Sequence, residues 1–120
     1  SAGGARVEPP RCASCSGRVR PGVVWFGEDL PSKPWTAARE AAGRCEVFLC
    51  VGTSSVVQPA ASLTGMAARS GAITVQVNPH HTEIDDAVSF LLKGAAGKIL
   101  PELVAEIWGL GTAPVGGTDA

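Results

Sequence analysis

The 120-residue chain has the length of one compact domain and the composition of a folded protein. Hydrophobic residues make up 45% of it and charged residues 18%, which excludes an intrinsically disordered chain. The net charge is -1 and no Lys/Arg cluster is present, so we expect neither nucleic acid nor an anionic membrane as a partner.

The apolar runs and the cysteines bear on the cellular compartment. The longest apolar run, Val47–Val51, has the length of a strand and not of a membrane span. No signal-peptide pattern follows Ser1, so we expect a cytoplasmic, reducing location. Ser1 is not an initiator Met, and we expect that the chain begins within a longer protein. The four cysteines are then expected to be thiols or metal ligands before disulfides.

Apolar runs of strand length alternate with helical patterns along the chain. Residues 1–10 are rich in Gly, Pro and Ala and predict a loose lead-in, and the Gly-rich residues 109–120 predict a flexible tail. This order of elements favours an α/β fold with a parallel sheet. The predicted elements are a strand or extended loop over 23–26, helices over 35–44, 60–70 and 101–108, and strands over 46–51, 73–77 and 88–92.

Polar residues follow the first two core strands at their carboxyl ends. Gly52-Thr53-Ser54 comes after one strand and Asn78 after the next. In open α/β sheets the carboxyl ends of the strands form the ligand-binding crevice, and hydroxyl and amide groups bond ribose or phosphate oxygens. On spacing alone, these segments are more often two strand-end turns than a ligand site.

Cys12 and Cys15 have the spacing of one half of a zinc site, because two thiolates on one turn reach a single ion. Cys45 and Cys50 are candidates for the other half, although packing is the better interpretation of both. A redox CxxC pair would open a helix after a strand, and that context is missing. The four-cysteine hypothesis leaves a zinc-ribbon interaction domain as an alternative kind of protein.

Two other patterns are interpreted without a functional role. His80 and His81 lie in a polar loop with no identifiable orienting partner, so we interpret them as surface histidines. Gly109-x-Gly111 follows a predicted helix and not a strand, which excludes a dinucleotide fingerprint there.

Read in order, these segments resemble the sirtuin family over residues 11–108. Cys12-Ala-Ser-Cys15 followed by Arg20-Pro-Gly-Val-Val-Trp-Phe-Gly-Glu28 is similar to the second zinc pair and the acyl-lysine peptide loop. Gly52-Thr53-Ser54 is similar to the NAD loop, and Val77-Asn78 and Gly94-Ala95-Ala96 to the last two NAD contacts. Trp25 in place of Phe resembles the bacterial and mitochondrial deacylase branch.

The resemblance implies an NAD-dependent protein-lysine deacylase, which converts acyl-lysine and NAD to lysine, nicotinamide and 2′-O-acyl-ADP-ribose. It implies the C-terminal part of a Rossmann-like parallel sheet with flanking helices over 23–108, plus half of a zinc-ribbon element over 12–20. Cys12 and Cys15 would be two of four Zn²⁺ ligands. The implied NAD contacts are Gly52, Thr53, Ser54, Asn78 and Ala96, and the implied contacts to the acyl-lysine peptide or protein are Val24, Trp25, Phe26, Gly27 and Glu28.

Several family motifs do not occur in this chain, namely the Gly-Ala-Gly-x-Ser phosphate loop, the Gln-Asn-x-Asp segment, the catalytic His and the first cysteine pair. We therefore assign no catalytic residue and expect the 120-residue chain alone to be inactive and marginally stable, with an unpaired sheet edge. The alternative is an inactive module that binds NAD, ADP-ribose or acyl-peptide. The acyl group preferred, the protein substrates and the oligomeric state have no signal in the sequence.

Overall fold

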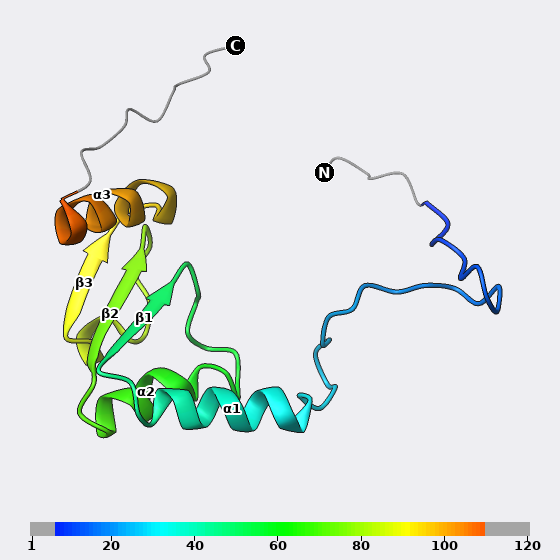
Figure 1. Cartoon of the computed structure of the whole chain (residues 1–120), viewed down its shortest axis with the longest axis horizontal. Coiled ribbons are helices and arrows are strands. Elements are labelled where there is room, and N and C mark those ends of the chain that lie inside the picture. The colour runs from blue at the N-terminus through cyan, green and yellow to red at the C-terminus, as the bar shows by residue number, and fades with distance from the viewer. Residues whose placement is uncertain (1–6, 110–120) are drawn as a thin grey trace, which may run out of the picture. The chain divides into compact units, whose positions relative to one another are not determined.

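The computed structural model describes residues 7–109, which fall into two compact units, one ending at Pro31 and the other beginning at Ser32 (Figure 1). The lead-in predicted over residues 1–10 lies largely outside the described residues, as does the tail predicted over 109–120. Within residues 7–109, no helix is both long and apolar enough to cross a membrane.

The first unit consists of a cysteine-containing turn and a loop. An antiparallel bridge joins Arg11 to Arg18 across the turn, and the amide of Cys12 donates to the carbonyl of Gly17 at 2.8 Å. Val23 to Phe26 forms no strand, so the loop alternative is the one observed. A turn follows, in which the amide of Glu28 donates to the carbonyl of Trp25 at 3.1 Å.

A parallel three-stranded sheet forms the centre of the second unit, as the sequence predicted (Figure 1). Its order is β1 (Val47–Val51), β2 (Ile73–Asn78) and β3 (Phe90–Lys93). In the register, Val51 is opposite Val77, and Asn78 is opposite Lys93. The carboxyl ends of all three strands therefore lie along one edge of the sheet.

Three α-helices and one 3₁₀ turn accompany the sheet. Figure 1 shows α1 and α2 together on one side of the strands and α3 on the opposite side. Gly71 (φ +89°) follows the end of α2 and takes a backbone conformation that favours glycine. The bounds are Ser32–Ala42 for α1, Ser62–Arg69 for α2, Asp85–Ala87 for the 3₁₀ turn η1 and Ala96–Trp108 for α3.

Several predicted boundaries were wrong. Helix α1 begins at Ser32 and not at Trp35, because a proline such as Pro34 is tolerated in the first turn of a helix. Two further shifts lie near the third strand. Helix α3 begins at Ala96 and not at Pro101, which is its sixth residue, so the helix tolerates one missing backbone hydrogen bond. Strand β3 begins at Phe90 and not at Val88, because Ser89 bonds Thr74 through side chains in place of a regular strand ladder. The Ser89 hydroxyl accepts from the Thr74 amide at 3.1 Å, and the Ser89 amide donates to the Thr74 hydroxyl at 3.0 Å.

Strand β2 is the buried strand, and its interior is partly polar. Thr74 and Gln76 are each 1% exposed, and Val77 is fully buried. Among the described residues, every buried side-chain nitrogen and oxygen has a hydrogen-bond partner, so these polar groups are satisfied. Strand β1 pairs only with β2 in this sheet, and its Leu49 is 47% exposed.

Candidate functional site

A cavity of about 440 Å³ lies at the carboxyl ends of β1 and β2. It joins the two segments that sequence reasoning proposed as one pocket. Its lining residues are Gly52, Thr53, Ser54 and Val56 after β1, and Asn78, His80, His81, Thr82 and Glu83 at the end of β2 and after it.

The β1 end of the cavity is shaped by a left-handed backbone at Gly52. Its φ is +63°, and a Cβ placed there would meet no atom within 4 Å, so the glycine is required by conformation and leaves open space above the backbone. Its amide donates to the carbonyl of Val77 at 2.9 Å, which extends the sheet by one bond. The Thr53 hydroxyl accepts from the amide of Ser55 at 3.1 Å and fixes the next turn.

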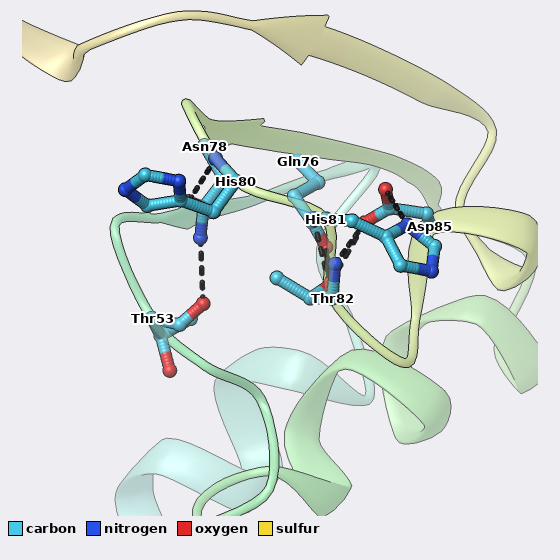
Figure 2. Close-up of polar contacts among 7 residues, drawn as sticks. All are labelled: Thr53, Gln76, Asn78, His80, His81, Thr82 and Asp85. Carbon is cyan, nitrogen blue, oxygen red and sulfur yellow. Dashed lines mark hydrogen bonds and ion pairs between the residues drawn. The ribbon is translucent and has the colours of Figure 1, made fainter.

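Asn78 connects the two strand ends (Figure 2). Its side chain is largely buried, and its Nδ2 donates to the carbonyl of Thr53 at 2.8 Å. Its Oδ1 accepts from the amide of His80 at 3.1 Å. One amide side chain therefore sets the separation of both loops that line the cavity.

The far wall of the cavity is held by a polar cluster that we define as Gln76, His81, Thr82 and Asp85 (Figure 2). Burial raises the pKa of Asp85, but the hydrogen bonds from His81, Thr82 and Gln76 outweigh it and lower the pKa to about 2. The carboxylate is therefore ionised at neutral pH. Sequence reasoning missed this cluster, although the Thr-x-x-Asp spacing of residues 82–85 resembles a capping box and was a usable signal.

Ala96 does not line this cavity. It is the first residue of α3 and comes directly after the short loop that follows the carboxyl end of β3. In that loop the amide of Gly94 donates to the carbonyl of Asn78 at 3.1 Å. A Cβ on Gly94 would lie 2.9 Å from the Ile99 side chain, so this glycine lets α3 start close to the strand end.

The predicted peptide contacts lie in the first unit, on the loop after the cysteine turn. Phe26 is 93% exposed, and Gly27 has a φ of +86°, which suits glycine in the turn. Arg20 organises the loop, because its guanidinium donates to Glu28 at 2.6 and 3.1 Å and to the Val23 carbonyl at 2.7 Å. It also stacks 3.9 Å from the centre of the Trp25 ring.

Two further contacts complete this loop. Glu28 accepts from the amide of Trp25 at 3.0 Å, and its bonds from Arg20 and Trp25 lower its carboxyl pKa. The same ion pair raises the pKa of Arg20. Val24 is 42% exposed beside them, so the apolar side chains of this loop are open to a partner.

The cysteine turn presents donors suited to a metal but not a full set. Hydrogen bonds from the backbone of Ser14 and Cys15 lower the pKa of the Cys12 thiol, which favours the thiolate that binds zinc. Residues 7–109 contain no group of three or more His, Cys, Asp or Glu that could hold a metal ion. Cys50 is buried and bonds Ser55 and Thr64, as expected for a packing residue.

An open parallel α/β sheet with a glycine- and hydroxyl-lined cavity at its strand ends places the chain in the class of α/β proteins that bind ligands at that edge. Comparison with known proteins narrows that class. The model of the Sir2 family matches residues 4–59. In sequence and in fold the chain is similar to the Sir2 family, whose members are also called sirtuins.

Relatives and solved structures agree with this similarity. The chain is 54% identical over 102 residues to an NAD-dependent protein deacylase of Methylococcus capsulatus and 42% identical over 101 residues to one of Mycobacterium tuberculosis. These alignments cover 85% and 84% of this chain, but only 40% and 42% of the relatives, so the chain spans about two fifths of their length.

Two solved structures are similar to the chain in both fold and sequence. A Sir2 homologue in complex with NAD gives a TM-score of 0.76 at 39% identity, covering 82% of this chain and 39% of that one. A Sir2 protein bound to acetylated peptide gives a TM-score of 0.74 at 32% identity, covering 85% of this chain and 42% of that one. The predicted α/β fold and the predicted resemblance to the sirtuin family are therefore confirmed.

Proposed function

We propose that this chain is the adenosine- and peptide-binding part of an NAD-dependent protein-lysine deacylase. The observation that carries the proposal is the cavity between the β1 and β2 ends, where Asn78 joins both loops through Thr53 and His80. Relatives named NAD-dependent protein deacylase and a similar Sir2 structure holding NAD support this choice of nucleotide.

In this proposal the cavity receives the adenosine half of NAD. Gly52 offers open backbone, and Thr53 and Ser54 offer hydroxyls to ribose or phosphate oxygens. Asn78 joins the two loops at a fixed separation and is a proposed contact to NAD. Ala96 contributes a backbone contact from the start of α3, at the same edge of the sheet.

The acyl-lysine peptide is assigned to the loop of the first unit. Its backbone would pair with an extended peptide by strand addition, and the exposed Val24 and Phe26 would contact the acyl-lysine side chain. A similar Sir2 structure bound to acetylated peptide supports a protein or peptide substrate. The complete set of proposed contacts is Val24, Trp25, Phe26, Gly27 and Glu28.

Zinc is proposed as a structural ion held in part by Cys12 and Cys15. The lowered pKa of Cys12 fits a thiolate ligand, and tetrahedral zinc needs two further ligands. We assign residues 11–108 to a partial catalytic domain, with 12–20 as the zinc element and 23–108 as the Rossmann-like part. A cytoplasmic location fits reduced thiols at this turn.

The chain supplies binding groups, and no residue of it is assigned to proton transfer. The parent reaction would move the acyl group of lysine to ADP-ribose with loss of nicotinamide. One alternative is a binding module without turnover.

The experiment is calorimetric titration of the purified chain with ADP-ribose, with deacylation of an acetyl-lysine peptide followed by mass spectrometry in the presence of NAD. We expect saturable ADP-ribose binding and no deacylation by the chain alone. Absence of binding would remove the assignment of the cavity. Turnover by the pure chain would instead show that a base is present here and that the assignment of roles is wrong.

A further inference from the structure

Asp85 lies behind the nucleotide cavity and is not one of its lining residues. Its side chain is only 7% exposed, and it sits at the start of η1, directly after the loop that forms the cavity wall. A nearly buried carboxylate is costly unless several donors satisfy it.

The Asp85 carboxylate accepts from three side chains and one backbone amide. Its Oδ1 accepts from Gln76 Nε2 at 2.6 Å, from Thr82 Oγ1 at 2.9 Å and from the Thr82 amide at 3.0 Å. Its Oδ2 lies 2.6 Å from His81 Nδ1. All the donors thus converge on one ionised group, as Figure 2 shows.

These donors belong to two different parts of the site. Thr82 and His81 line the cavity, whereas Gln76 is 1% exposed in the core strand β2, two residues before Asn78. Gln76 Nε2 also donates to Thr82 Oγ1 at 2.8 Å, which closes the cluster. The carboxylate therefore ties the loop that lines one side of the cavity to the buried strand β2.

We propose that Asp85 is a positioning residue for the nucleotide cavity, which fixes the wall at His81 and Thr82 at the distance from Asn78 that adenosine requires. The inference rests on the proposed nucleotide function of the cavity. Asp85 itself makes no contact with the nucleotide. Asparagine has the same shape but cannot replace Asp85. Its side-chain NH2 group is a donor and would face one of the donors that now converge on the carboxylate.

The test compares Asp85→Asn with the wild-type chain, with Asp86→Asn as the matched control. Asp86 is the next residue of η1 and is exposed. ADP-ribose affinity is measured by calorimetry at a temperature at which circular dichroism shows every variant fully folded. We expect Asp85→Asn to weaken binding about tenfold, the loss of one charge-assisted contact, and Asp86→Asn to leave it unchanged.

A second pair of variants covers the case in which Asp85→Asn does not fold. Thr82→Val removes the hydroxyl that meets Asp85 and Gln76, and Thr82→Ser restores it. We expect weaker binding with valine and recovery with serine. The side-chain amide protons of Gln76 provide a spectroscopic readout, because both are hydrogen bonded in the wild type and their NMR shifts should move in Asp85→Asn.

The outcomes separate this inference from the proposed function. If the wild-type chain binds ADP-ribose and both Asp85→Asn and Thr82→Val bind it equally well, the positioning role is overturned and the nucleotide site stands. If Asp85→Asn lowers only the melting temperature, Asp85 is a stabilising residue and the inference is also overturned. If the wild-type chain does not bind ADP-ribose, the proposed function falls and this role falls with it.

Discussion

Replacement of Asn78 by Ala tests the connection on which the cavity depends. The change removes the bond from Nδ2 to the Thr53 carbonyl and the bond from the His80 amide to Oδ1. A lost hydrogen bond costs ~0.5–1.5 kcal/mol, and a buried group left without a partner costs ~1–3 kcal/mol. Thr53 and His80 are exposed, so water can replace the missing partner at each.

The stability loss should therefore fall in the lower part of that range, at about 1–2 kcal/mol in urea denaturation. The loss of ADP-ribose affinity should be larger, about 1–3 kcal/mol. The variant loses the proposed contact between Asn78 and the ligand, and the two loops that line the cavity are also no longer joined. Asn78→Asp is a useful companion, since it keeps the acceptor for His80 but has no donor for Thr53. Thr36→Ala, on an exposed position of α1, serves as the control.

Calorimetry with ADP-ribose measures the affinity, and urea denaturation measures the stability. The reasoning would be refuted by an unchanged dissociation constant for Asn78→Ala. It would also fail if Thr36→Ala weakened binding to the same extent, because the effect would then not be local to the strand ends.

Three further predictions concern acid stability, the peptide loop and the cysteine turn. The folded-state pKa of Asp85 is about 2, below its ordinary value of 3.8, so its contribution to stability is present above pH 3.8 and is lost as pH falls toward 2. Asp85→Asn should lack this part of the acid transition in a pH series of urea denaturation. Arg20→Gln should raise the amide exchange rate of Trp25 without changing global stability, because the contacts of Arg20 are local and exposed. Cys12→Ser should abolish the thiolate-to-metal absorption band in a Co²⁺ titration of the chain.

Each of these predictions has a control and a contradicting result. An acid transition of equal size in Asp85→Asn would show that other groups cause it. Arg18→Gln, which removes a neighbouring exposed ion pair, is the control for the loop, and equal exchange rates in both variants would contradict the role of Arg20. Cys45→Ser should keep the Co²⁺ band, and a band that survives in Cys12→Ser would overturn the metal assignment.

Several elements could be predicted from local pattern alone. The continuous apolar run at Val47–Val51 indicated a parallel strand, and the structure has β1 there, although only Cys50 of it is buried in this chain. The same reasoning failed at α3, where Pro101 was interpreted as a first-turn residue. Proline is tolerated within a helix when packing compensates for the missing bond, and the close approach of Gly94 to Ile99 depends on tertiary contact that a local pattern does not contain.

Some residues of the candidate site could likewise be predicted from the sequence, and others could not. Gly52, Thr53, Ser54 and Asn78 were predicted from their places after strands, because strand ends of a parallel sheet meet at one edge. His80 and His81 were interpreted as surface residues without a partner; both are exposed, but they also line the cavity, and His81 pairs with Asp85 at 2.6 Å. No local pattern distinguishes a histidine beside a cavity from one on an open surface.

By itself the sequence determined the order of strands and helices, the residue types at the strand ends and the motifs that indicate the Sir2 family. Only the tertiary structure decided that Asn78 bonds Thr53, 25 residues away in the chain, and that Gln76 and Asp85 hold the cavity wall. Strand and helix patterns repeat over a few residues and are visible locally. A cavity and a converging set of donors depend on the register between strands, which exists only once the sheet has formed.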